Sequence, residues 1–451
     1  MGKIFGTDGI RCIVNTEPLT AETTLKISKT VGYLLKSKKR NHSRVIICKD
    51  TRLSGYLYEP LITAGFISMG MEVILVGPLP TPAVPHLMRT LRADIGVMIT
   101  ASHNTYEYNG IKFFNLDGFK ISLKLEREIE NIVLNNKKYS KILNSNNKTG
   151  KAIRLEDASG RYSEFLKSTL NKNIKTKELK IVLDCGNGAT YDIAPSIFWE
   201  LGHQVVSIND KPNGKNINYK CGAVNVGSLC KKVVEEKANI GFAFDGDGDR
   251  LIVVDDKGNE IDGDKIIALF AKYLIIGKKT VSKFPVVTTV MSNLGLENFL
   301  LKDLGIKLKR SPVGDINVIE EMKKNKSFLG GEQSGHIILS DFSKTGDGIL
   351  AALKITEIMS IIKKSSSSIF DLYDNLPQIK VNISYKKISE KTKKNIKDLN
   401  KKNSRDKKIR VLIRFSGTEP LIRLLVEGQD LKIVQQKAKN LELEIRNIIG
   451  Q

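Results

Sequence analysis

Three stretches of this chain follow the same plan, and this repetition limits its fold more than any other sequence feature. Each has a short apolar run, a turn, a helical stretch ending at glycine, and a second apolar run. The first runs are RVIICKDTR (44–52), KIVLDCGNGA (180–189) and FPVVTTVMSNLG (284–295), and the second are MGMEVILVG (69–77), LGHQVVSI (201–208) and LGIKLKRSPVGD (304–315). Continuous apolar runs are typical of parallel strands buried on both faces. The sequence therefore predicts three α/β domains built on βαβ units.

The last part of the chain has a different plan. After the Ser/Lys-rich KKSSSSIFD (363–371) come VNISYKK (381–387), a lysine-rich helical stretch, RVLIRFSGTEPLIRLLVEG (410–428) and a closing helix. This order of strand, helix, hairpin and helix predicts a smaller α+β domain. With 451 residues, the chain is long enough for several cores. We expect four domains, at 1–150, 151–255, 256–367 and 368–451.

Composition and charge limit the kinds of partner and the cellular compartment that we expect. The net charge of +23 resides largely in polar, lysine-rich stretches at 135–151 and 386–408, without an RNA-binding or zinc-finger pattern. We therefore expect anionic substrates and no nucleic-acid partner. No apolar run has transmembrane length, and MGKIFGTDGIR lacks a signal-peptide pattern, so we expect a cytoplasmic protein without a membrane partner. The five cysteines form no CxxC pair, which favours free thiols.

The clearest chemical signal is FAFDGDGDRLIVVD (242–255), in which Asp245, Asp247 and Asp249 alternate with glycine. Three carboxylates this close repel one another and need a cation. Oxygen ligands suit Mg²⁺ or Ca²⁺ rather than zinc. An EF-hand would need glycine after the third acid and glutamate at position twelve, where Arg250 and Asp256 stand. A solvent-exposed acidic hairpin is the alternative.

Ser102 lies in TASHN (100–104), where an apolar run ends. It lacks the GxSxG pattern of a hydrolase nucleophile, and its neighbour His103 is poorly placed as a triad base. A phosphoserine would add about −1.5 to −2 charges and strong acceptor oxygens, which an incompletely coordinated Mg²⁺ would bind, with Arg250 balancing the charge. A plain turn residue remains the alternative.

Two further motifs suit a phosphorylated sugar, and a third is a glycine-rich turn. RFSGTEPLIR (414–423) combines two arginines with hydroxyls and a glycine, as phosphate loops do, although an ordinary hairpin turn would also fit. In GGEQSGH (330–336), Glu332 and Ser334 could bind sugar hydroxyls and His336 could exchange a proton, or the loop could be structural. FGTDGIR (5–11) ends in Arg11 and is weak alone.

Together these motifs, in this order over essentially the whole chain, resemble the α-D-phosphohexomutase superfamily. The resemblance implies a four-domain architecture around a central cleft, with three α/β domains and a smaller C-terminal α+β domain. It implies that Ser102 carries the transferred phosphoryl group and that one Mg²⁺ is held by Ser102, Asp245, Asp247 and Asp249. The remaining residues implied for catalysis are Arg11, His103, Lys112, Arg250 and His336, and those implied for the substrate are Gly314, Asp315, Glu332, Ser334, Arg414, Ser416, Gly417, Thr418 and Arg423.

The implied reaction moves a phosphoryl group between O6 and O1 of one sugar through a sugar 1,6-bisphosphate. Gln333 in GEQSGH is similar to the residue at this position in the family branch that acts on glucosamine phosphates. The alternatives are an enzyme that acts on glucose or mannose phosphates and a catalytically silent phosphosugar-binding protein. We expect a monomer or homodimer. Cys12, Thr105, Ile316 and Phe415 depart from or vary within the family pattern. None of them replaces the serine, the acids or the phosphate loop, so we expect activity.

Overall fold

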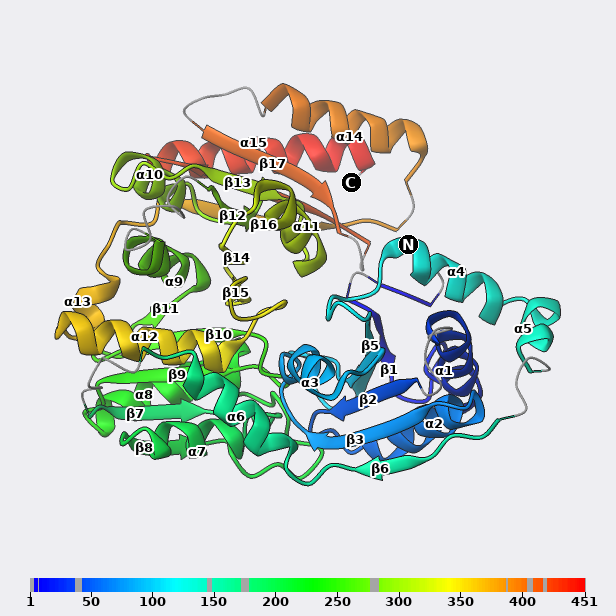
Figure 1. The fold of residues 1–451 in the computed structure, drawn as a ribbon. Coiled ribbons are helices and arrows are strands. Elements are labelled where there is room, and N and C mark those ends of the chain that lie inside the picture. Colours follow the sequence, from blue (N-terminus) through cyan, green and yellow to red (C-terminus); the bar gives the residue numbers. More distant parts are fainter. Residues whose placement is uncertain are drawn as a thin grey trace.

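The computed structural model describes residues 4–6, 8–36, 43–143, 148–171, 178–275, 284–386, 388–403, 409–416 and 420–450. These residues form four units, each with its own sheet, which follow one another round the molecule (Figure 1). Among the described residues, no helix combines the length and the apolar composition needed to span a lipid bilayer.

The first unit has a six-stranded sheet in the order β1-β5-β4-β2-β3-β6. Its strand β2 is buried on both faces, because Val45 and Ile47 pack into one hydrophobic cluster and Ile46 and Cys48 into another. The elements are β1 (Ile10–Ile13), α1 (Ala21–Leu35), β2 (Arg44–Lys49), α2 (Gly55–Ser68), β3 (Glu72–Pro78), α3 (Ala83–Leu91), β4 (Ile95–Ile99), β5 (Tyr108–Phe114), α4 (Leu123–Val133), α5 (Asn136–Leu143) and β6 (Ala152–Arg154).

The second unit has a five-stranded sheet in the order β11-β10-β9-β7-β8. Its elements are α6 (Ala158–Ser168), β7 (Lys180–Asp184), α7 (Ile193–Glu200), β8 (Gln204–Ile208), the 3₁₀ turn η1 (Gly222–Val224), α8 (Gly227–Glu235), β9 (Ile240–Phe244), β10 (Leu251–Asp255) and β11 (Glu260–Ile261). Antiparallel β9 and β10 are joined by the acidic loop that contains Asp245, Asp247 and Asp249.

The third and fourth units have a four-stranded sheet, β13-β12-β14-β15, and a three-stranded sheet, β16-β18-β17. The third contains α9 (Gly263–Phe270), the π-helical turn η2 (Ala271–Ile275), β12 (Val286–Thr289), α10 (Leu294–Lys302), β13 (Leu308–Ser311), α11 (Asp315–Asn325), β14 (Leu329–Gly331), β15 (Ile337–Leu339), α12 (Gly348–Ile362) and α13 (Ser366–Phe370). The fourth contains β16 (Gln378–Ser384), α14 (Glu390–Asn403), β17 (Ile409–Phe415), β18 (Leu421–Gly428) and α15 (Leu431–Ile449).

The three predicted βαβ units and the final α+β unit are confirmed. The strand pairs β2–β3, β7–β8 and β12–β13 are all parallel, and each brackets one helix. The glycines after these helices, Gly70, Gly202 and Gly305, have φ angles of 73°, 82° and 67°, which is the left-handed region that favours glycine. The limits at 150 and 255 stay predictions; the pairing of β6 with β3 and of β11 with β10 favours slightly later ones.

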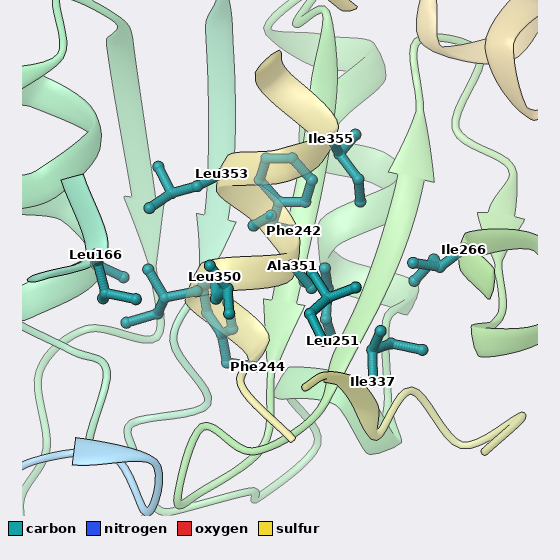
Figure 2. Close-up of a cluster of buried hydrophobic side chains, with 14 of the residues drawn as sticks. Leu166, Phe242, Phe244, Leu251, Ile266, Ile337, Leu350, Ala351, Leu353 and Ile355 are labelled. Carbon is teal, nitrogen blue, oxygen red and sulfur yellow. The ribbon is translucent and has the colours of Figure 1, made fainter. Parts of the chain in front are cut away.

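Helix α12 crosses between units. Although it lies in the stretch predicted as the third domain, it packs against Phe242, Phe244 and Leu251 of the second sheet (Figure 2). Nearly all its residues are buried, including Leu350 and Leu353. One hydrophobic cluster consequently includes residues of the first three units, so these units share a core.

Candidate active site

Ser102 lies just after β4 with its backbone in the left-handed region, at a φ of 50°. This conformation is strained for a residue with a side chain, and surrounding contacts must hold it. The Ser102 carbonyl accepts hydrogen bonds from Arg52 Nη2 at 2.9 Å and Asn218 Nδ2 at 2.8 Å. The Ser102 amide donates to Thr100 Oγ1 at 2.9 Å. The serine is only 2% exposed, and the loop presents its hydroxyl in one fixed position.

Arg52 organises this loop, and sequence reasoning missed it. Its guanidinium is fully buried, pairs with Asp50 at 2.8 Å, and donates to the carbonyls of Asn104 at 2.7 Å, Tyr108 at 3.1 Å and Thr105. A signal was available: KDTR follows β2, which runs parallel to β4, and parallel neighbours end at the same edge of a sheet. Polar residues after both strands would therefore meet.

The acidic loop lies directly against Ser102. Asp245, Asp247 and Asp249 are buried, and one carboxylate oxygen of each lies within 4.8 Å of the others. Ser102 Oγ donates to Asp245 Oδ2 at 2.7 Å. Burial, followed by the charges of Asp249 and Asp247, raises the pKa of Asp245 well above its usual range. A Cβ on Gly246 would stand 2.7 Å from the Ser102 carbonyl, so the close approach of the two loops requires glycine.

The chemistry of these carboxylates fits a divalent cation. The Oδ1 atoms of Asp247 and Asp249 are buried and have no hydrogen-bond partner among the described residues. Unpaired buried carboxylate oxygens are costly unless a cation binds them. The three acids beside Ser102 Oγ are therefore suited to hold a divalent cation.

Lys112, on β5, is a buried cation within the acidic cluster. Its Nζ lies 2.9 Å from Asp247 and 3.4 Å from Asp249, and 3.2 Å from Asp8. Although burial opposes both charges, the pairing raises the pKa of Lys112 and lowers the pKa of Asp247. Thr81 Oγ1 also donates to Asp247 at 2.6 Å. Sequence reasoning missed Thr81 and Asp8, although Asp8 stands within the GTDGIR motif.

The basic residues predicted for catalysis gather round the same point. Arg11 pairs with Asp8 at 2.7 Å and donates to Asn104 Oδ1 at 3.2 Å. The Arg250 backbone N–H donates to Asp245 Oδ1 at 3.2 Å. Although burial opposes its charge, Asp245 and Asp249 raise the pKa of Arg250, so its positive charge stands beside the acids.

Two imidazoles complete this group. His103 Nδ1 lies 3.4 Å from Ser102 Oγ, and burial, with the charges of Arg250 and Arg11, lowers the pKa of His103 to about 3, so it is neutral near pH 7. His336 forms a backbone bridge with Arg250, and its Nε2 accepts the Gly346 N–H at 3.2 Å. His336 Nε2 is also 3.9 Å from Asp249 Oδ2. All the residues predicted for catalysis are therefore near one another.

The predicted sugar-binding residues form a second group. The Gly314 N–H donates to Glu332 Oε1 at 3.0 Å, and Ser334 Oγ donates to Glu332 Oε2 at 3.3 Å. The Gln333 amide is already engaged, because its Oε1 accepts Lys380 Nζ at 2.9 Å and its Nε2 donates to Asp262 at 3.1 Å. Gln333 therefore links the loop that contains Glu332 and Ser334 to the fourth unit.

The predicted phosphate loop joins β17 and β18. Arg414 and Arg423 stand directly opposite each other on these strands, and burial together with the Arg423 charge lowers the pKa of Arg414. The Ser416 N–H donates to the Leu421 carbonyl at 2.8 Å. Gly417 and Thr418 lie outside the described residues. Like charges opposite one another are unfavourable unless an anion lies between them, so the pair is suited to a phosphate.

The departures from the family pattern leave these groups intact. Cys12 pairs with Asn109 in the β1–β5 ladder, and the Thr105 carbonyl is one of the Arg52 acceptors. The Ile316 N–H donates to Asp315 Oδ1 at 2.8 Å, and the Phe415 ring packs edge-on against Tyr385.

Four family models match consecutive parts of the chain. They describe α/β/α domains I, II and III and the C-terminal domain of phosphoglucomutase/phosphomannomutase, at residues 2–140, 160–258, 262–378 and 379–443. The chain therefore belongs to the phosphoglucomutase/phosphomannomutase family. It is an isomerase of the phosphohexomutase class.

Individual relatives are similar to this chain over nearly its whole length. The chain is 47% identical over 447 residues to the phosphoglucosamine mutase of Parvibaculum lavamentivorans, with 99% of each chain covered. It is 46% identical to that of Thermodesulfovibrio yellowstonii, with 98% of each covered.

Solved structures agree with this fold. A phosphoglucomutase/phosphomannomutase family protein from Burkholderia thailandensis has a TM-score of 0.81 at 22% identity, covering 99% of this chain and 97% of that one. Aspergillus fumigatus N-acetylphosphoglucosamine mutase in complex with GlcNAc-6P and magnesium has a TM-score of 0.63 at 16% identity, covering 99% and 96%. At these identities the likeness shows the fold alone.

Proposed function

We propose that this enzyme is a phosphoglucosamine mutase, which interconverts glucosamine 6-phosphate and glucosamine 1-phosphate. The name shared by relatives 42–47% identical over nearly the whole chain supports the choice of sugar. The observation that carries the mechanism is the 2.7 Å hydrogen bond from Ser102 Oγ to a buried triad of carboxylates. A hydroxyl fixed beside three carboxylates suits a phosphoserine bound to a metal ion.

The proposed reaction consists of two phosphoryl transfers. In the first, the sugar O1 attacks the phosphorus on Ser102; the P–O1 bond forms as the P–Oγ bond breaks. The O1 proton leaves to His103 or His336, and Ser102 Oγ takes up a proton, for which charged Lys112 is a candidate donor. In the second, Ser102 Oγ attacks the phosphorus on O6 and loses its proton; the P–Oγ bond forms as the P–O6 bond breaks, and O6 gains a proton. The sugar 1,6-bisphosphate is the intermediate and the activator.

The two groups of residues have different roles in the reaction. Arg11, Lys112 and Arg250 balance the charge of the transferring group. Asp245, Asp247 and Asp249, together with the phosphate on Ser102, would hold one Mg²⁺. When bound, that ion would neutralise negative charge on the phosphoryl oxygens. Glu332 and Ser334 hold sugar hydroxyls, with Gly314 and Asp315 beside them. The non-reacting phosphate is assigned to Arg414, Ser416, Gly417, Thr418 and Arg423.

Because one phosphate loop and one serine serve both transfers, the bisphosphate must turn over between them within a central cleft. Closure of the fourth unit would retain it there, as lids do in other enzymes. We assign the enzyme to the cytoplasm, where it acts as a monomer or homodimer. It needs neither nucleic acid nor a membrane as a partner.

Phosphorus NMR tests the reaction and the sugar together. The 6-phosphates of glucosamine, glucose and mannose are each incubated with enzyme, Mg²⁺ and a trace of the corresponding 1,6-bisphosphate. We expect an anomeric phosphate signal that grows fastest with glucosamine, and none with Ser102→Ala. Faster growth with glucose or mannose would keep the mechanism and overturn the substrate, and no signal with any sugar would favour a binding protein.

Intact-mass analysis tests the phosphoserine separately. We expect a phosphorylated fraction after incubation with a sugar bisphosphate, located on Ser102 by peptide mapping. Unmodified protein throughout would contradict the mechanism.

A further inference from the structure

Lys120 lies between the two halves of the proposed active site. It ends a tight turn after β5, in which the Asn115 N–H donates to the Phe119 carbonyl at 2.8 Å and Lys120 forms a bridge back to Phe114. Its side chain is only 7% exposed. Its Nζ contacts Asp8 of the first unit and Asp315 Oδ2 of the third unit, the latter at 2.5 Å.

The Asp8 contact leads to the phosphoryl-transfer residues. Besides Lys120, Asp8 pairs with Arg11 at 2.7 Å and with Lys112 at 3.2 Å. Lys112 in turn reaches Asp247 at 2.9 Å. The position of Asp8 therefore influences where two cations stand relative to the acidic triad and Ser102.

The Asp315 contact leads to the sugar-binding residues. Asp315 begins α11 directly after Gly314, whose φ is 116° and whose N–H donates to Glu332 Oε1 at 3.0 Å. Glu332 also accepts from Ser334. Holding Asp315 therefore holds the loop that positions Glu332.

We propose that Lys120 is a positioning residue that couples the phosphoryl-transfer residues of the first unit to the sugar-binding loop of the third. This inference rests on the proposed function. A sugar phosphate must satisfy both groups at once, so an error in their spacing weakens substrate binding and alignment. Lys120 touches neither Ser102 nor the acidic triad, and it acts through its two carboxylate partners.

The charges agree with a permanent bridge. Although burial opposes ionisation, Asp315 and Asp8 raise the pKa of Lys120, so it stays charged. Burial opposes the charge of Asp8 as well, but its neighbours Lys112, Lys120 and Arg11 hold the pKa of Asp8 well below its usual range. Without Lys120, the Asp8 and Asp315 carboxylates would face each other with no cation between them.

Steady-state kinetics of Lys120→Met tests the coupling, because methionine keeps the length of the side chain without its charge. We expect the KM for the sugar phosphate to rise about tenfold, as loss of a charged contact would produce, and kcat to fall less than threefold. Lys120→Arg should recover most of the loss. Lys354→Met is the matched control: Lys354 is also buried and paired, with Glu357 at 2.8 Å, but lies on α12 away from these groups. It should lower the melting temperature and leave KM unchanged.

Adding Asp315→Asn to Lys120→Met separates positioning from simple repulsion. This second change removes one of the two facing charges but cannot restore the bridge, so KM should stay high. A return of KM to the wild-type value would overturn the proposal. So would an unchanged KM in Lys120→Met, or a failure of arginine to improve on methionine.

The proposed function can fail separately. If the wild type turns over glucose or mannose phosphate instead, the same variants are measured with that sugar. If the wild type turns over none, calorimetric affinities for glucose 1,6-bisphosphate replace KM, and the same tenfold weakening is expected. An equal affinity in wild type and Lys120→Met would then overturn the coupling.

Discussion

Ser102 combines a strained backbone with a buried hydroxyl, and its hydrogen-bond partners are charged or polar side chains. The Arg52 and Asn218 side chains hold its carbonyl, while Asp245 accepts its hydroxyl proton. Strain of this kind persists only where several contacts determine the conformation. At the scale of single residues, the site is a set of buried charges that compensate one another and leave carboxylate oxygens for a cation.

Asp247→Ala should abolish turnover while the protein stays folded. The side chain carries a buried, unpartnered Oδ1 that is suited to the metal. We expect activity to fall by at least about a hundredfold, the scale of losing one strong electrostatic contact to a transition state. Mg²⁺ should raise the melting temperature of the wild type and not of the variant. Asp303→Ala, at an exposed position, is the control. Near-normal activity in Asp247→Ala would remove the metal assignment.

Asp264, on α9, should make stability depend on pH. Burial, then the charge of Asp262, raises its pKa to about 7. Because the folded state holds this proton more tightly than the unfolded state, its contribution is complete below about pH 4 and is lost as pH rises through about 7. Asp264→Asn keeps an acceptor for the Asn293 N–H, which lies 2.7 Å from Asp264 Oδ2.

The variant should therefore gain stability on the order of 2–4 kcal/mol over the wild type at pH 8 and almost nothing at pH 4. Urea unfolding at the two pH values measures this difference. An equal difference at both would show that Asp264 does not titrate in this range.

At the scale of elements, the site is built where loops from different sheets meet. The Ser102 loop follows β4, the KDTR loop follows the parallel neighbour β2, and the acidic loop joins β9 to β10. Glycine permits the contact between the acidic loop and the Ser102 loop: a Cβ on Gly246 would stand 2.7 Å from the Ser102 carbonyl. The loops therefore hold one another in place, and Arg52 of the loop after β2 donates to four carbonyls of residues 102–108.

Arg52→Met should disorganise the Ser102 loop. It removes donors to four carbonyls and leaves buried Asp50 without its cation. We expect a loss of about 3–5 kcal/mol in the free energy of unfolding, as for other broken buried pairs, together with loss of Ser102 phosphorylation. Arg44→Met, which breaks a half-exposed pair with Glu72, should cost less than about 1 kcal/mol. Full phosphorylation in Arg52→Met would show that the loop holds its shape without this arginine.

At the scale of the whole molecule, α12 joins units that the chain order separates. It follows the third sheet in sequence but packs on the second, beside Leu166 of α6 (Figure 2). The acidic loop and the sugar loop therefore sit on one continuous core, and Lys120 adds a polar link from the first unit to the third.

Leu353→Ala on α12 should destabilise the molecule beyond its own unit. Leu353 is fully buried, and truncating such a side chain costs about 2–5 kcal/mol. Ile361→Ala on the same helix is the control, because Ile361 is 56% exposed and should cost less than about 0.5 kcal/mol. Hydrogen exchange should show faster opening of amides in both β9 and β12. Faster exchange in only one of these strands would contradict a shared core.

The sequence by itself determined the three βαβ units, the closing α+β unit and the motifs of the site. Buried parallel strands leave continuous apolar runs, and groups such as Asp245, Asp247 and Asp249 lie close together because they are close in sequence. Only the tertiary structure decided the roles of Arg52, Asp8 and Lys120 and the position of α12. Lys120 meets Asp315 across 195 residues, and Arg52 meets Ser102 across 50. Such pairs leave no periodic or local pattern, since a lone charged residue reads as a surface residue until folding brings its partner beside it.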